Sequence, residues 1–107
     1  MKYFTIVMCN GDTFKYFYGC VPDDLKNDEI IRMCKEYHPD MFGKESAQEL
    51  RSGGFELLAI CNIDLLLNQP IVYLYYPAAA NETIERALNI YLDDVLIPVL
   101  QEKAEMD

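Results

Sequence analysis

The residues best suited to chemistry are the single histidine and the cysteine one helical turn before it. The chain has one His, His38, and four cysteines, at positions 9, 20, 34 and 61. Cys34 and His38 are four residues apart, so on a helix they would share a face and form a Cys–His pair for nucleophilic catalysis. Together with Asp40 they would supply three ligands to a metal ion, without a fourth at local spacing. Cys34 also belongs to an apolar stripe and His38 precedes a proline, which favours a core thiol and a helix end over either site.

The segment Tyr37-His38-Pro39-Asp40 resembles the His-Pro-Asp loop that follows a helix in J-domain cochaperones. The resemblance covers about a dozen residues and implies stimulation of a heat-shock chaperone through that tripeptide. Members of the family place a short helix where this chain has strands, and their preceding helix carries a basic face. In this chain three acidic residues of segment 28–36 offset its two basic ones. The sequence is therefore not identified as a member of that family.

The remaining motifs do not predict a catalytic or metal site. The two serines lie in polar, loop-like sequence and lack the context of a nucleophile elbow. Gly53-Gly54 precedes a strand, so it is not typical of a phosphate-binding loop. Asp93 and Asp94 would bring two carboxylates to a Mg²⁺ ion, but such sites collect several oxygens, and an acidic helix face usually serves solubility. We expect no catalytic residue, no metal and no cofactor.

Length and charge limit the class of protein. The chain has 107 residues, which predicts one domain, 1–107. Eighteen Asp and Glu against nine Lys and Arg give a net charge of −9, which argues against direct nucleic-acid binding. Seven of the acidic residues lie in 81–107, where only Arg86 and Lys103 oppose them. No apolar run is long enough to span a membrane and the N-terminus lacks a signal peptide, so we expect a cytoplasmic protein with four reduced, buried thiols.

Hydrophobic periodicity predicts an α+β fold, a four-stranded, mainly antiparallel sheet with two main helices in the order β-β-α-β-β-α. Asn10-Gly11-Asp12 favours a tight hairpin in which Asn10 pairs with Thr13. Pro98 is expected to kink the last helix or restart it. The expected strands are 2–9, 13–21, 55–63 and 71–76, and the expected helices are 27–37, capped by Asn27, a short extra helix near 44–51, and a last helix capped by Asn81.

Aromatic and apolar residues exceed what one core face needs. The hairpin register places Tyr3, Tyr16 and Tyr18 on the sheet face opposite the predicted core. The connection before the fourth strand contains three consecutive leucines, 65–67, which are either tucked under the sheet or exposed as a contact patch. The last helix is apolar on more than one side. The tyrosines by themselves favour core-edge positions with their hydroxyls at the rim over an interface. The second aromatic face and the apolar last helix together favour contact with a partner or a homodimer.

Together these observations predict a non-enzymatic interaction protein. It would bind a partner with a basic or nucleic-acid-binding surface and inhibit or regulate it, as many small acidic phage or mobile-element inhibitors do. One alternative is a small-molecule or metal-binding domain with a pocket between the tyrosine-lined sheet and the last helix. Another is a small enzyme centred on Cys34 and His38 or on the Asp93–Asp94 pair. The predicted partner-binding residues are Tyr16, Tyr18, Tyr75, Glu85, Asp93 and Asp94.

Overall fold

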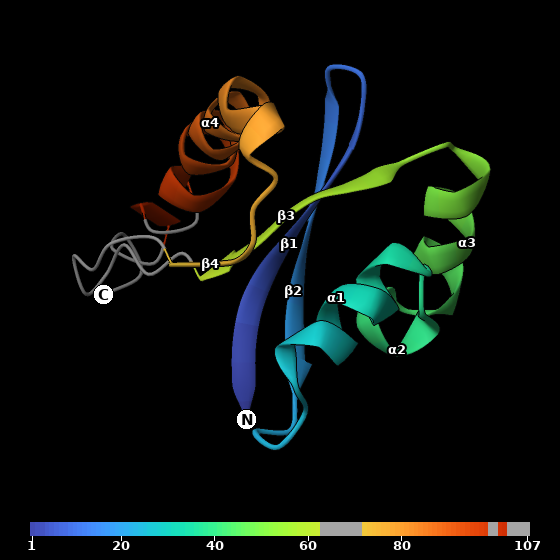
Figure 1. Ribbon diagram of the computed structural model, residues 1–107. Coiled ribbons are helices and arrows are strands. Elements are labelled where there is room, and N and C mark those ends of the chain that lie inside the picture. The colour runs from blue at the N-terminus through green and yellow to red at the C-terminus, as the bar shows by residue number, and fades with distance from the viewer. Residues whose placement is uncertain (63–71, 99–100, 103–107) are drawn as a thin grey trace. The chain divides into compact units, whose positions relative to one another are not determined.

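The computed structural model describes residues 1–62, 72–98 and 101–102, which divide between two compact units, 1–77 and 78–107 (Figure 1). The expected single domain stays a prediction, because each unit is described by itself. The order of elements confirms the α+β fold. The first unit contains β1 (Lys2–Asn10), β2 (Thr13–Val21), α1 (Asn27–Lys35), α2 (Pro39–Phe42), α3 (Lys44–Ser52), β3 (Glu56–Asn62) and β4 (Val72–Tyr75), and the second contains a 3₁₀ turn (Ala78–Ala80), α4 (Asn81–Ile90) and a π-helical segment (Tyr91–Leu96).

The sheet is antiparallel throughout, with the strand order β2-β1-β3-β4. The predicted hairpin register is confirmed, since Asn10 pairs with Thr13 and the loop has two residues. Gly11 has a φ of 60°, a conformation that glycine adopts without the steric cost other residues incur. A two-residue loop with glycine first is typical of the turns that match strand twist. The loop therefore fixes which side chains of β1 and β2 share a face.

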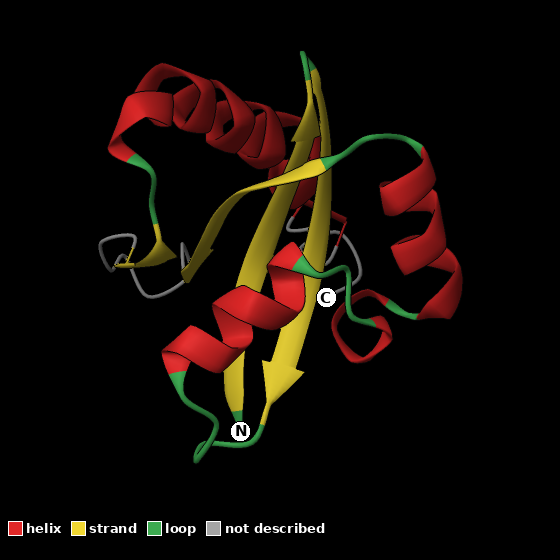
Figure 2. Cartoon of the chain, turned by 45° about the vertical axis from the view of Figure 1, so that its right-hand side comes forward, coloured by secondary structure: helices red, strands yellow, loops and turns green. Residues whose placement is uncertain are grey.

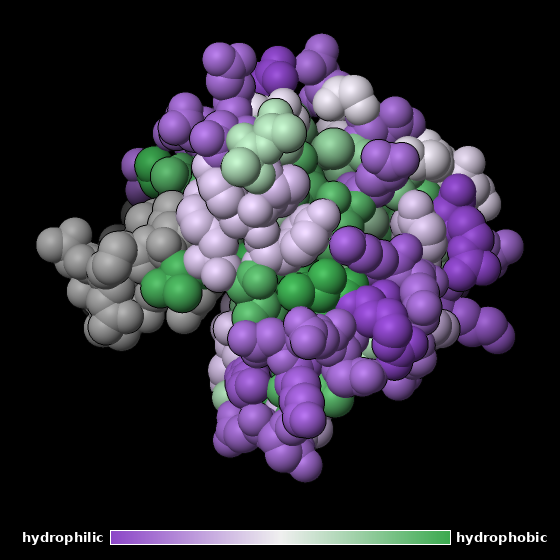
Figure 3. Space-filling view, in the orientation of Figure 1, coloured by the Kyte–Doolittle hydropathy of each residue, from purple (hydrophilic) through white to green (hydrophobic). Residues whose placement is uncertain are grey.

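One face of the sheet carries the core of the first unit. In Figure 1 and Figure 2 α1, α2 and α3 lie on that face, and hydrophilic residues cover the outer surfaces of α1 and α3 (Figure 3). The Phe17 ring meets the Phe42 ring edge-on, with 5.1 Å between their centroids. Strands β1 and β2 present every second residue to the helices. The buried cluster contains Phe4, Ile6, Met8, Val21, Ile30, Cys34, Met41, Phe42, Ala47, Leu50, Phe55 and Ile60.

Helix α1 ends in a turn that glycine usually occupies. Tyr37 has a φ of 56°. The His38 N–H donates to the Met33 carbonyl at 3.0 Å and the Tyr37 N–H to the Cys34 carbonyl at 3.4 Å, which is the hydrogen-bond pattern of a Schellman motif. His38 then caps α2, because its Nδ1 accepts a hydrogen bond from the Asp40 N–H at 3.1 Å. A His-Pro pair is typical of a helix end, so the sequence does not predict this second helix, α2.

In the second unit the helix widens ahead of Pro98. Residues Tyr91–Leu96 are π-helical, and the Ile97 N–H donates to the Leu92 carbonyl. Pro98 has no N–H, and its ring crowds the carbonyl four residues earlier in an α-helix. A wider turn before the proline relieves that crowding. The expected disturbance by Pro98 thus takes the form of a π-helical segment.

Several predicted boundaries were wrong. Asn27 and Asn81 are the first residues of α1 and α4, whereas Lys26 and Ala80 are the N-caps, and neither cap uses a side chain. The 3₁₀ turn before α4 draws the chain into helical form early, so Asn81 already lies inside the helix. Helix α1 ends at Lys35 because the left-handed Tyr37 follows. The three consecutive leucines, 65–67, lie outside the described residues.

The contact between Phe4 and Gly19 gives a test of the hairpin packing. The two residues are register partners, and a Cβ on Gly19 would lie 2.2 Å from Cε2 of the Phe4 ring. Gly19→Ala is therefore expected to lower the free energy of unfolding by about 1–3 kcal/mol, measured by urea denaturation. Phe4→Leu in the same chain should restore part of the loss, because the two substitutions share one contact. Strictly additive effects would contradict this packing.

Candidate functional site

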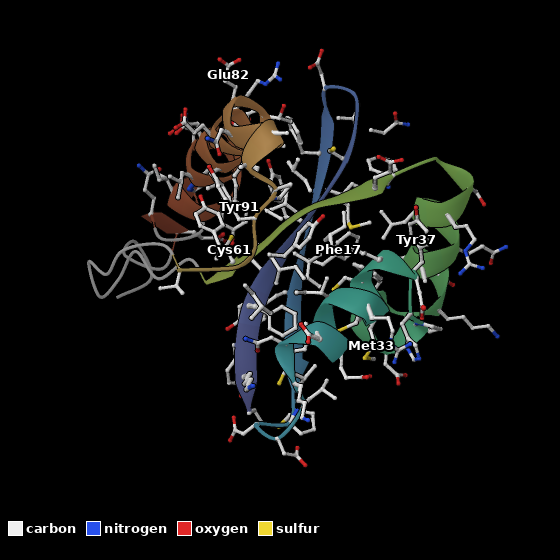
Figure 4. All side chains as sticks on the ribbon, in the orientation of Figure 1. Phe17, Met33, Tyr37, Cys61, Glu82 and Tyr91 are labelled. Atoms are coloured by element: carbon white, nitrogen blue, oxygen red, sulfur yellow. The ribbon has the colours of Figure 1, made fainter. Side chains whose placement is uncertain are left out.

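The described part of the second unit has an acidic groove along α4 and the π-helical segment. Glu82, Glu85, Asn89 and Asp93 follow one another at spacings of three or four, which places them on one helix face. Glu82 projects from the first turn of α4 (Figure 4). The three acidic residues predicted to bind a partner, Glu85, Asp93 and Asp94, line the same groove. The groove has a volume of about 400 Å³ and is lined by Glu82, Glu85, Arg86, Asn89, Ile90, Asp93 and Asp94.

Negative charge dominates this groove. Four carboxylates line it against one guanidinium, that of Arg86, and all five side chains are exposed. Exposed carboxylates that share a concave surface attract cations and steer basic partners. Asp93 and Asp94 belong to the π-helical segment, a feature often found at functional sites. Ile90, 36% exposed, adds an apolar contact to the same groove.

The predicted tyrosines do not form one surface. Tyr16 and Tyr18 lie two residues apart on β2, and Tyr18 is 72% exposed and stacks on Tyr3 with ring centroids 5.9 Å apart. Tyr75 lies on β4, at the opposite edge of the sheet. It pairs with Ile60 and packs on the helix-covered core, with the Lys35 Nζ 4.8 Å from its ring centroid. Tyr16 and Tyr18 are thus on the face predicted for them, and Tyr75 supports the core edge.

The buried thiol of Cys34 is unsuited to nucleophilic catalysis. Cys34 is fully buried, and burial raises its pKa to about 12, so the reactive thiolate does not form at neutral pH. Among the described residues, the His38 ring interacts with Asp40, both with its N–H at 3.1 Å and with its carboxylate at 3.7 Å. The described residues contain no group of three or more His, Cys, Asp or Glu able to hold a metal ion.

The four cysteines differ in exposure more than the sequence predicts. None forms a disulfide. Cys34 and Cys61 are buried as expected, but Cys9 is half-buried and Cys20 is exposed. Cys20 pairs with Tyr3 near the open end of the hairpin, on the face opposite the helices. The expectation of four buried thiols was therefore wrong for Cys20, because apolar neighbours in sequence do not decide the face of a strand residue.

Of the hollows described in the first unit, two have volumes of about 400 Å³ or more. One, of about 400 Å³, opens where the start of β1 meets α1 and β4, and its walls include Tyr3, Ile30 and Tyr73. The other, of about 470 Å³, runs along α3 and contains Lys44 and Arg51. This basic groove is not among the sites predicted from the sequence. Its signal was the spacing of Lys44, Gln48 and Arg51 within one predicted helix, which places them on one face.

Comparison of the chain with protein-family models, with curated proteins and with solved structures finds no match. Within the part of the chain that the structure describes, no helix combines the length and the apolar character needed to cross a membrane. The function of this chain is therefore inferred from the geometry and charge of these surfaces.

The exposure of the thiols predicts their order of modification. In the folded protein iodoacetamide should alkylate Cys20 first, then Cys9, and should reach Cys34 and Cys61 only after unfolding, because accessibility and thiolate formation both control the rate. Peptide mapping by mass spectrometry after timed labelling measures the order. Labelling in urea is the control, where all four thiols should react at similar rates. Rapid labelling of Cys34 in the native protein would contradict the burial.

The buried thiols also predict a loss of stability at alkaline pH. Burial raises the pKa of Cys34 to about 12 and of Cys61 to about 11, from the ordinary 9.0. At a pH between 9.0 and these raised values, the two thiols keep their protons in the folded chain and lose them in the unfolded chain. The free energy of unfolding is therefore undiminished by these groups below pH ~9 and falls as pH rises toward the folded values. Urea denaturation at pH ~8 and pH ~10.5 should show a smaller fall for Cys34→Ala than for the original chain. Equal falls would contradict the assignment.

Proposed function

We propose that this chain is a small acidic interaction protein that binds a basic surface of a partner protein and inhibits or regulates it. A partner that handles nucleic acid fits this chemistry, since its binding surface is built to receive phosphates and carboxylates would take their place. The observation that carries the proposal is the groove on α4 and the π-helical segment, where Glu82, Glu85, Asp93 and Asp94 are exposed together.

Three features support an interaction surface over a merely hydrated helix. The carboxylates share one exposed surface of a single helix, so a partner's clustered cations can meet several of them at once. Ile90 lies within the groove and adds apolar area to be buried. The π-helical turn keeps Asp93 and Asp94 in the groove although the helical register has changed. A partner with clustered Arg or Lys and some apolar surface matches all three.

The test is capture of partners from the cell extract in which the chain is native, after nuclease treatment, at ~50 mM and ~500 mM salt. The acidic variant carries Glu85→Gln, Asp93→Asn and Asp94→Asn. A matched control removes three exposed carboxylates from the first unit instead, with Asp24→Asn, Asp28→Asn and Glu49→Gln. Circular dichroism checks that both variants keep their helices.

We expect one stoichiometric protein that is held at low salt, lost at high salt, lost by the acidic variant and kept by the control. Recovery of the bait alone at both salt concentrations contradicts the proposal. Equal retention by the acidic variant also contradicts it, because the binding surface would then lie elsewhere. If both variants lost the partner alike, net charge and not the groove would explain the binding. That result would also overturn the assignment of the groove.

A further inference from the structure

The groove along α3 brings two basic side chains, Lys44 and Arg51, to one surface of this acidic chain. Lys44, Ala47, Gln48 and Arg51 lie at spacings of three and four on α3, so their side chains share one helix face. Tyr37 forms part of the groove wall. The groove has a volume of about 470 Å³ and is lined by Tyr37, Pro39, Lys44, Ala47, Gln48, Arg51 and Ser52.

Elsewhere in the first unit a basic side chain does form ion pairs with carboxylates. Arg32 on α1 makes ion pairs with Glu29 at 2.7 Å and with Glu36 at 2.9 Å. By contrast, neither Lys44 nor Arg51 makes an ion pair with any described residue. The chain has twice as many acidic as basic residues, yet these two cations stay open to a ligand from outside.

Arg51 is held in place for such a ligand. One of its N–H groups donates to the Glu36 carbonyl at 3.0 Å, and its guanidinium lies 5.5 Å from the centroid of the Tyr37 ring. A guanidinium has five N–H donors in a planar fork, so several remain for an incoming carboxylate. Prior positioning lowers the entropy lost when that contact forms.

Tyr37 occupies its place at a conformational cost. Its φ of 56° lies in the left-handed region, which bulky residues avoid and which glycine would adopt freely. The hydroxyl of Tyr37 donates to the Phe55 carbonyl, which anchors the ring between the core and Arg51. Figure 4 shows Tyr37 between the end of α1 and α3. Strained residues of this kind cluster at binding sites.

We infer that the α3 groove binds an acidic peptide segment of a partner protein, with one carboxylate at Lys44 and another at Arg51. Seven residues of helix separate the two cations by ~10 Å along the axis, and an extended peptide spans that distance in about three residues. Tyr37 and Pro39 also line the groove and offer apolar contact to such a segment. This inference concerns the first unit and does not depend on the acidic groove.

The test is a titration of the ¹⁵N-labelled full chain with a short poly-glutamate peptide whose ends are blocked, followed by amide chemical shifts. A poly-glutamine peptide of the same length controls for backbone contacts, and tripolyphosphate distinguishes a simple anion site. Lys44→Gln removes one cation that forms no ion pair with the described residues. Lys26→Gln is the matched control, since Lys26 is an exposed lysine outside the groove.

We expect poly-glutamate to shift amides of α3 and Tyr37, and Lys44→Gln to weaken binding by about tenfold, the loss of one charge-assisted contact. Lys26→Gln should bind as the original chain does, and poly-glutamine should shift nothing. Three results overturn the inference: no shift on α3, equal weakening by both lysine variants, or binding of tripolyphosphate without binding of the peptide. Arg51→Gln is less informative on its own, because it also breaks the bond to the Glu36 carbonyl.

Discussion

The first unit depends on the burial of β1 between two neighbouring strands. Each residue of β1 has a partner in β2, and its second half also pairs with β3. Because side chains alternate along a strand, a shift of one residue would exchange the whole face that meets the helices. The two-residue loop at Gly11 prevents that shift. Phe4 can then lie against Gly19, and Ile6 and Met8 belong to the same buried core.

The same constraint positions the groove on α3. Helix α1 packs on the face that β1 presents, and it must end where the core ends. The chain turns there through Tyr37 and His38 into α2 and then α3. Tyr37 is used twice, since its ring packs against the core and also lies beside Arg51. A glycine at this position would relieve the left-handed backbone but would leave the guanidinium without its wall.

How far the sequence predicts this structure depends on the range of the forces involved. The hairpin register followed from Asn10-Gly11 alone, because turn chemistry is local. The four-residue helix α2 is not predicted because its cap is the His38 ring nitrogen, a less common cap than Ser, Thr, Asp or Asn. Tyr37 in the left-handed region contradicts local preference, and contacts from Phe55 and Arg51, far along the chain, add to the local hydrogen bonds that sustain it. The grouping of Glu85 with Asp93 was predictable from helical spacing, whereas the position of Tyr75 on the core edge required the strand order.

Charge acts on the two grooves in opposite ways. A basic partner approaching the acidic groove is attracted by the net charge of −9 as well as by the local carboxylates, so its association is fastest at low salt. An acidic peptide approaching Lys44 and Arg51 is repelled by that net charge until it comes within about one Debye length, ~10 Å at 0.1 M salt. Only the short-range contacts of the α3 groove favour its binding. Moderate salt would therefore weaken the first of these proposed interactions and shield the second from repulsion.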